Sequence, residues 1–421
     1  MAAPRTVEGD GLHRINNALA DTELRLLIAA CGRPATPTLQ STIDACLAAP
    51  IRWPHLTALA ARHRVAGLVH DTLFRAGVDP AVLADSGLTT LTQRGTLLAL
   101  QLAREAVRLQ AAFNSAGLAA IVVKGAPLGT LAYGNVGIKH CWDIDLLVQA
   151  HAVAAARRLL LELGYAMTEP AGLEDAQFER FCAFSKEAIF INAFGLAVEL
   201  HWRLVDPPEM LAEADPFADC RTVAIAGGEV CTLGDRIHLA YLACHGQRHG
   251  WSRLKWIADV HGLIARQPPS TTATMIEGAA RHGAGRSVAA ALWLCHDLFA
   301  LDVDAELLRD WRKRATMRMI RATNHRCIAA PLGGSELPIY SRTNLAILAT
   351  VLAAAPTWRV RWGFFKTIWN RPVERELRPP ESLARYSVRR FIQVMVGLPA
   401  RVARDRALSR KAKAGPRQNQ E

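Results

Sequence analysis

The stretch IVVKGAPLGTLAYGNVGIKHCWDIDLLV, residues 121–148, carries the clearest structural pattern of this chain. It continues an apolar, β-branched run that begins at residue 118 and ends at Val123, and such a run predicts a strand. A Lys-Gly pair follows it, then a short helical segment that ends at Tyr133 and a glycine-containing loop. The stretch closes on Asp-Ile-Asp-Leu-Leu-Val, residues 143–148, which predicts a second strand. Two strands joined through a glycine turn and a short helix therefore form the centre of the expected fold.

Strand and helix patterns alternate after this stretch. They predict one helix and four strands paired as two hairpins, at residues 151–163, 188–191 with 196–204, and 223–225 with 229–231. Strands and helices mixed in this way predict the α+β class with a small mixed sheet.

Helical patterns occupy both sides of this small core. Apolar residues recur at helical spacing from about residue 16 to 115, and again from residue 235 to about 301. We expect the mixed-sheet core to lie between N-terminal and C-terminal helical subdomains. The expected parts are an N-terminal helical domain, an α/β core, a helical subdomain, and a basic C-terminal helix with a disordered tail, at residues 1–115, 116–233, 234–357 and 358–421.

Asp143 and Asp145 are the first candidates for chemistry. They lie two residues apart in a predicted strand, so both side chains leave the same face of the sheet. Two carboxylates held so close repel each other unless a cation lies between them, and Mg²⁺, which prefers oxygen ligands, suits such a pair. Taken alone, the pair is more typical of a solvated strand face than of a metal site.

Further residues favour a metal- and phosphate-binding site over a solvated strand face. Lys124 and Gly125 lie between a strand and a helix, where backbone N–H groups bind an anion and the lysine adds a charge. Glu199 places a third carboxylate in a later strand, where it can bind a metal or accept a proton from an attacking hydroxyl. His201 shares the face of Glu199 and is expected either to assist it or to be a half-buried packing residue.

The stretch 121–148 resembles the DNA-polymerase-β-like nucleotidyltransferase superfamily. It is most similar to a bacterial branch of largely uncharacterised nucleotidyltransferases that carry Lys-Gly, a short helix and then Asp-x-Asp-Leu-Leu-Val. The similarity spans roughly residues 50–265 and includes the segments Arg62-His-Arg-Val65, Glu199-Leu-His-Trp202 and 238–259.

This resemblance implies a role for each candidate residue. It makes Asp143 and Asp145 the metal ligands and, with Glu199, the catalytic residues. The nucleotide-binding residues that it implies are Lys124, Gly125, Lys139, His245 and His249. The two histidines lie one helical turn apart and are expected to line the nucleotide or acceptor pocket, with plain packing as the alternative. Their spacing also suits zinc, but no third ligand is evident beside them.

Two positions depart from the pattern of the family. Lys139 lies where relatives usually carry arginine. A lysine cannot form the bidentate hydrogen bonds that a planar guanidinium makes to phosphate. Trp142 replaces what is often a small residue. These departures favour the alternative of a nucleotide-sensing or partner-binding protein on the same fold, without turnover.

Bulk properties exclude several classes of protein. The nine cysteines are scattered and form no Cys-x-x-Cys pair, which indicates a reducing compartment rather than a disulfide framework. The N-terminus lacks the apolar core of a signal peptide, and the apolar stretch 345–355 has about half of the ~20 residues that a spanning helix needs. We therefore expect a cytoplasmic protein.

The net charge of +12 is concentrated at the C-terminal end, where residues 358–421 hold 16 Lys and Arg against 5 Asp and Glu. The rest of the chain is near neutral and lacks the signal of a basic groove, so no sequence-specific nucleic-acid partner is expected. Within the tail, residues 385–396 combine an apolar stripe with a basic face. This segment is expected to contact an acidic peptide, an acidic protein or an anionic membrane surface, or else to pack on the core.

Together these features predict a Mg²⁺-dependent nucleotidyltransferase. It would move a nucleoside monophosphate from an NTP, with ATP as the first candidate, to a hydroxyl of an acceptor. A small molecule, a peptide and a protein side chain all remain open as acceptors, and the sequence does not indicate the oligomeric state.

Overall fold

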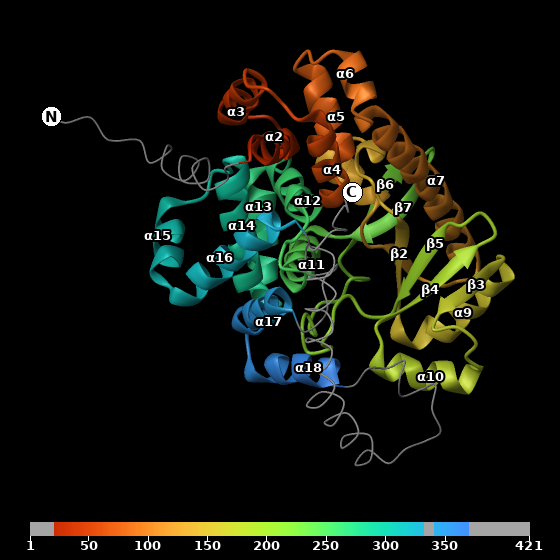
Figure 1. Ribbon diagram of the computed structural model, residues 1–421. Coiled ribbons are helices and arrows are strands. Elements are labelled where there is room, and N and C mark those ends of the chain that lie inside the picture. The colour runs from red at the N-terminus through yellow and green to blue at the C-terminus, as the bar shows by residue number, and fades with distance from the viewer. Residues whose placement is uncertain (1–20, 332–340, 370–421) are drawn as a thin grey trace, which may run out of the picture.

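The computed structural model describes residues 21–331 and 341–369 of the chain. Within them, a β-sheet lies on one side of the molecule and a body of helices on the other (Figure 1). The structure confirms the expected mixed α/β architecture. The predictions for residues 385–396 and for the rest of the tail after residue 369 lie outside the described residues.

Helices form the first part of the described chain. Asp21 caps the first of them by accepting hydrogen bonds from two backbone N–H groups, and Thr36 caps the next by accepting one from the N–H of Leu39. These helices are α2 (Thr22–Cys31), α3 (Pro37–Leu47), α4 (Trp53–His63), α5 (Ala66–Arg75), α6 (Pro80–Asp85) and α7 (Leu88–Ser115).

The sheet has five strands in the order β1-β2-β5-β4-β3. They are β1 (Ala120–Val122), β2 (Asp143–Val148), β3 (Tyr165–Glu169), β4 (Glu187–Asn192) and β5 (Ala197–His201). Strand β2 runs antiparallel to β1 and parallel to β5, while β4 runs antiparallel to both of its neighbours. The connecting segments are α8 (Ala126–Tyr133), η2 (Val136–Ile138), η3 (Ala150–Ala152), α9 (Val153–Glu162) and α10 (Asp175–Phe184).

A separate hairpin adjoins the first strand of this sheet. It consists of β6 (Cys220–Ile225) and β7 (Gly228–Leu233), which run antiparallel. The hydroxyl of Thr232 donates a hydrogen bond of 2.7 Å to the carbonyl of Val122, and this bond ties the hairpin to β1.

The sequence patterns located most of these elements. Strand β2 has the predicted bounds, and both predicted hairpins form, as β4 with β5 and as β6 with β7. Strand β3 and helix α10 were not predicted. Only the first residue of β3, Tyr165, is fully buried, so the strand shows no alternation of apolar and polar residues.

The remaining described helices follow the hairpin. They are α11 (Asp235–Arg248), α12 (Leu254–Ala265), α13 (Pro269–Arg281), α14 (Gly285–Phe299), α15 (Ala305–Lys313), α16 (Ala315–Ala329), α17 (Arg342–Ala354) and α18 (Trp358–Trp369). None of the helices in the described part of the chain is both long and apolar enough to cross a membrane.

Two hydrophobic cores hold the described residues together. The first core joins buried residues of helices α2 to α5 with those of α11 to α18, so the two helical segments pack as one body. The second core joins α7, α9 and α10 to one face of the sheet and to the β6–β7 hairpin. Helix α7 therefore packs mainly against the sheet. The expected domain boundary at residue 115 stays a prediction.

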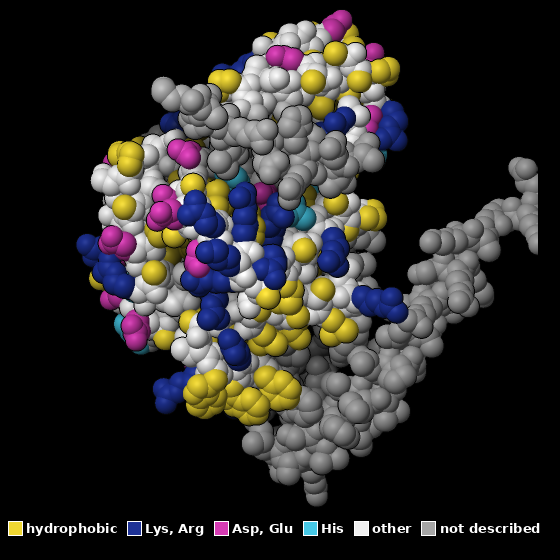
Figure 2. Space-filling view, turned by 90° about the vertical axis from the view of Figure 1, so that its left-hand side faces the viewer, with side chains coloured by type: hydrophobic (Ala, Val, Ile, Leu, Met, Phe, Trp, Pro, Cys, Tyr) yellow, Lys and Arg dark blue, Asp and Glu magenta, His cyan; other side chains and the backbone are white. Residues whose placement is uncertain are grey.

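The C-terminal helices carry a basic, partly aromatic surface. Figure 2 shows Lys and Arg side chains gathered on this side of the molecule, above a patch of hydrophobic side chains at the height of α18. Arg286, Arg314 and Arg361 line a cavity of about 900 Å³ here. Trp358 and Trp362 are 71% and 53% exposed. The positive charge of the chain is thus visible on α14 to α18 as well as in the sequence of the tail.

Candidate active site

The sheet register brings the third carboxylate beside the acidic pair. Strands β2 and β5 are parallel neighbours, and Asp145 lies directly opposite Glu199. Ile144 and Leu146 point into the core on the other face of the sheet, so Asp143 and Asp145 share the face that looks toward the helical body. The predicted placement of Glu199 on a neighbouring strand is confirmed.

The Lys-Gly turn lies at the end of β1, next to the same residues. The backbone N–H of Val123 donates a hydrogen bond of 2.9 Å to the carbonyl of Asp145, which holds the turn against β2. Gly125 has φ of 76° and ψ of −127°, a conformation that side-chain-bearing residues rarely adopt. It precedes α8, whose N-terminus has no side-chain cap. Uncapped N–H groups at a helix start are suited to bind a phosphate.

Lys124 closes one side of the acidic group. Its Nζ lies 2.6 Å from Oδ1 of Asp145, and the Asp145 side chain is only 1% exposed. Burial alone would raise the pKa of this carboxyl, but the charge of Lys124 and a hydrogen bond from His201 hold the pKa well below its ordinary value. In the same way, burial alone would lower the pKa of Lys124, and the Asp145 carboxylate raises it well above the ordinary value. The pair is therefore fully ionised.

The pKa of Asp143 is shifted in the opposite direction to that of Asp145. Burial and the neighbouring Asp145 carboxylate raise the pKa of Asp143 to about 6. Two neighbouring carboxylates whose pKa values are driven apart are typical of a functional site. A divalent cation would supply a counter-charge and favour the ionised form of both groups.

His201 joins the carboxylates of three strands. Its Nε2 lies 3.2 Å from Oδ1 of Asp145 and 3.4 Å from Oε2 of Glu199. Its Nδ1 lies 3.2 Å from Oε2 of Glu187, which pairs with His201 across β4 and β5. The sequence pattern indicated His201 but not Glu187, which lies one residue before the strand predicted at 188–191. Counting back from a turn at residues 192–195 would have placed Glu187 opposite Leu200, one residue away from the register that the structure shows.

The arrangement fits a metal ion. Oδ2 of Asp145 is buried and has no hydrogen-bond partner among the described residues, so one strong oxygen ligand is unused. Ligand atoms of Asp145, Glu199 and His201 all lie within 4.8 Å of one another. Asp143 lies outside that group, although its carboxyl responds to the charges of Asp145 and Glu199. Its role as a metal ligand stays a prediction.

The predicted histidines form an aromatic cluster near the carboxylates. The rings of His245 and His249 are 4.8 Å apart, and His249 stacks on Trp256 at 4.8 Å with 23° between the planes. Burial and nearby cations lower the pKa of His249 to about 3 and that of His245 well below its ordinary value. Neutral rings are suited to stacking or hydrogen bonding and supply no charge to a phosphate. Their role in nucleotide binding stays a prediction.

Further cations surround the carboxylates. Lys186 is in hydrogen-bond range of His201 Nδ1 at 3.4 Å, and burial lowers its pKa to about 8. Burial and the neighbouring Lys139 lower the pKa of Lys255, on α12, to about 7. A bound polyphosphate would raise both pKa values, because a nearby negative charge favours the protonated amine. The sequence pattern gave no indication of Lys186.

Lys139 has a protein partner. Its Nζ lies 2.5 Å from Oδ2 of Asp259 on α12, and both side chains are buried. The hydroxyl of Tyr133 donates to the other oxygen of the same carboxylate at 2.9 Å. This buried group ties the loop before β2 to the helical body. Nucleotide binding by Lys139 stays a prediction, and its contact in this structure is structural.

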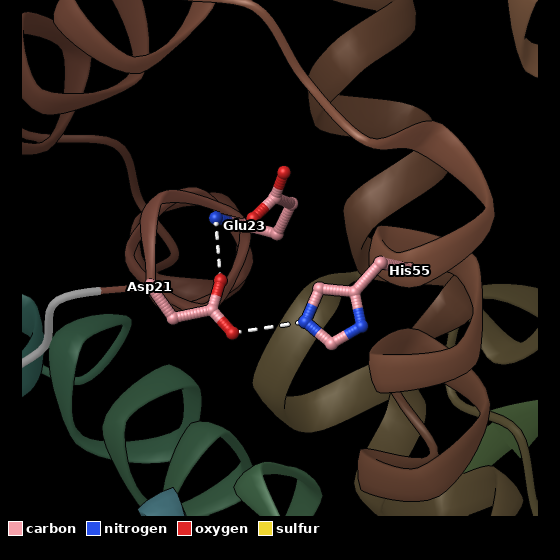
Figure 3. Close-up of side chains that lie close together, drawn as sticks. All are labelled: Asp21, Glu23 and His55. Carbon is pink, nitrogen blue, oxygen red and sulfur yellow. Dashed lines mark hydrogen bonds and ion pairs between the residues drawn. The ribbon is translucent and has the colours of Figure 1, made fainter.

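A second group of metal-ligand residues, far from the sheet, is a helix cap. Figure 3 shows Asp21, Glu23 and His55 side by side. Asp21 accepts from the backbone N–H of Glu23 at 3.0 Å and contacts His55 Nε2 at 2.9 Å. Both oxygens of Glu23 accept from Arg52, at 2.7 to 3.1 Å. These carboxylates are satisfied by protein donors, in contrast to Asp145.

This cap predicts an acid-dependent loss of stability. The hydrogen bond from Arg52 lowers the pKa of Glu23 from 4.5 to about 2. A lowered pKa in the folded state stabilises the protein above pH 4.5, and the contribution is lost as the pH falls toward 2. We expect the free energy of unfolding to fall less steeply over this range in Glu23→Gln than in the wild type. Urea unfolding at several pH values, with the exposed Glu277→Gln as control, measures the difference. Equal slopes in Glu23→Gln and the wild type would contradict the assignment.

Comparison with known proteins places the residues of this site inside a region that matches a protein family. The model of a family described as uncharacterised nucleotidyltransferase matches residues 49–300, which is more than half of the chain. The match includes the Lys-Gly turn, the acidic pair, Glu199 and both clustered histidines. A search of curated proteins found no match.

Proposed function

The chain belongs to the family of uncharacterised nucleotidyltransferases, and from this premise we propose that it transfers a nucleoside monophosphate from an NTP to a hydroxyl of an acceptor. The observation that carries the proposal is the pairing of Asp145 with Glu199 across parallel strands, with the Lys124-Gly125 turn beside them. An acidic group and a phosphate-binding turn are thereby placed within reach of one ligand.

A divalent ion, with Mg²⁺ as the first candidate, would be held by Asp145 and Glu199, with Asp143 beside them, and would neutralise charge on the triphosphate. The turn at Gly125 and the N-terminus of α8 would bind phosphate oxygens through backbone N–H groups. Lys124 would move from Asp145 toward the phosphates once a cation takes its place, because its ion pair with Asp145 is then no longer needed.

Glu199 is the residue in position to accept a proton. Its side chain is 25% exposed, whereas that of Asp145 is 1% exposed, so Glu199 is the more accessible of the two to an acceptor. In the reaction the acceptor oxygen forms a bond to the α-phosphorus as the bond to the bridging oxygen breaks. Pyrophosphate leaves with that electron pair, and the hydroxyl proton passes to Glu199.

The order of these parts along the chain supports membership of the DNA-polymerase-β-like superfamily. A glycine turn, an Asp-x-Asp strand and a later carboxylate on the adjacent strand are the features expected of it. We propose ATP as the donor to test first and the cytoplasm as the site of action. We also propose that the basic C-terminal end contacts an acidic partner.

Thermal unfolding with each NTP, with and without Mg²⁺, tests the proposed function. A ligand present at about 100 times its dissociation constant adds ~2.7 kcal/mol to the stability of the folded state. We expect a Mg²⁺-dependent rise in melting temperature with at least one NTP, and its loss in the double variant Asp143→Asn/Asp145→Asn. The control is Asp175→Asn, because Asp175 lies on α10 with a side chain that is 87% exposed.

Three outcomes separate the hypotheses. A shift that needs Mg²⁺ and both aspartates supports the site and names the donor, and the search for an acceptor follows from it. A shift without any pyrophosphate release in the presence of candidate acceptors would favour the nucleotide-sensing alternative. Absence of a shift with every NTP would overturn the proposal.

A further inference from the structure

His201 has the surroundings of a metal ligand. Its Nε2 faces two carboxylate oxygens at once, on Asp145 and Glu199, at 3.2 and 3.4 Å. The side chain is 4% exposed, so its orientation is set by the protein rather than by solvent. A nitrogen that converges with two carboxylates on one small volume is the geometry of a mixed nitrogen and oxygen site.

The other ring nitrogen contacts a carboxylate, with the Nζ of Lys186 also 3.4 Å away from it. Glu187 lies 3.2 Å from Nδ1 of His201, on the strand next to it. Histidines that bind metals commonly donate the second ring N–H to a carboxylate, which sets the tautomer and raises the basicity of the ligating nitrogen. With a cation between Nε2 and the two carboxylates, a proton on Nδ1 would leave the Nε2 lone pair for the cation. Without the cation, Nε2 donates its hydrogen bond to Asp145.

One buried carboxylate oxygen of the site is available to bind a cation. Oδ2 of Asp145 is buried without a hydrogen-bond partner among the described residues, and that carboxylate is 1% exposed. A histidine that served only to neutralise Asp145 would leave this oxygen unexplained. A cation held by the oxygen, by Glu199 and by Nε2 explains all three atoms.

We infer that His201 is a nitrogen ligand of the divalent ion in this centre, and that Glu187 positions it. The inference rests on the proposed function, because it concerns the same metal site. A nitrogen ligand favours a first-row transition ion over Mg²⁺, which prefers oxygen. The centre therefore binds Mn²⁺ more tightly than Mg²⁺, and the preference originates in His201.

Electron paramagnetic resonance of the full chain with Mn²⁺ alone tests the inference directly. Bound Mn²⁺ is counted from the loss of the free-ion signal, and electron spin-echo modulation reports whether a ¹⁴N nucleus is coordinated. We expect nitrogen modulation in the wild type and none in His201→Gln. The matched control is His245→Gln, which removes a nearby half-buried histidine that contacts rings and should keep the modulation.

The affinities of the variants for Mn²⁺ and Mg²⁺ give a second test. We expect Glu187→Ala to weaken Mn²⁺ binding by ~10-fold or more while the nitrogen modulation remains, since a residue that orients a ligand typically has that effect. In His201→Gln, we expect Mg²⁺ to compete with Mn²⁺ more effectively than in the wild type.

Each outcome decides the inference. Bound Mn²⁺ without nitrogen modulation in the wild type would overturn it and leave the proposed function intact, with His201 as a hydrogen-bonded neighbour of the carboxylates. Modulation that persists in His201→Gln would also overturn it. Failure of the wild type to bind Mn²⁺, Mg²⁺ or any NTP would overturn both the inference and the proposed function.

Discussion

Asp145→Asn is expected to slow pyrophosphate release by ~10³-fold or more, about 4 kcal/mol in activation free energy. The carboxylate lies at the meeting point of Lys124, His201 and Glu199, with one buried oxygen free for a cation. An amide lacks the negative charge that holds a divalent ion, and transition-state charge on the phosphates would lose its main counter-charge. The rate is measured with the NTP that binds, using the acceptor or, before one is identified, water in its place.

A control must distinguish a loss of catalytic rate from a loss of folded protein. Asp145→Asn removes the partner of Lys124, a side chain that is 21% exposed, so some loss of stability is expected as well. Asp143→Asn offers a second test, because it removes a carboxyl whose pKa is raised by burial and by Asp145. We expect it to reduce metal binding without lowering the melting temperature of the metal-free protein. An unchanged rate in Asp145→Asn would end its assignment as a catalytic residue.

Lys139→Met is expected to lower the free energy of unfolding by about 3 to 5 kcal/mol. It leaves the Asp259 carboxylate, whose side chain is 6% exposed, with the Tyr133 hydroxyl but without its cation. Urea unfolding followed by circular dichroism measures the loss. The double variant Lys139→Met/Asp259→Leu should recover most of it, because both charges are then removed together.

A surface pair provides the matched control. Arg75 forms an ion pair with Asp71, but its side chain is 71% exposed, so Arg75→Met should cost less than about 1 kcal/mol. If Lys139→Met instead left the stability unchanged and weakened NTP binding, the buried pair would not be the main role of Lys139. The nucleotide-binding role that the family resemblance implies would then be supported.

The local chemistry of the site could be predicted from the sequence. An apolar strand before Lys124-Gly125 and a second one that carries Asp143 and Asp145 are patterns of neighbouring residues, and neighbouring residues decide strand formation and side-chain direction. Glu199 was recognised because it lies in an apolar strand of the same kind. These predictions needed no information about how distant parts of the chain pack.

Other parts of the site depend on register and on long-range packing. The contact of Glu187 with His201 follows from the exact pairing of β4 with β5, and a slip of one residue would place Glu187 on the opposite face. The pair of Lys139 with Asp259 joins residues that are 120 positions apart. Composition and spacing hold no information about such a contact.

Patterns of neighbouring residues were enough to predict the α+β class, the strand that carries the acidic pair and the glycine turn beside it. The tertiary structure alone decided that α2 to α5 pack with α11 to α18, that α7 covers the sheet, and that His201 meets three carboxylates. The physical reason is that hydrophobic burial is non-directional. An apolar helix face is stabilised by any apolar surface that buries it. Which surface does so depends on the shape and register of the whole folded chain.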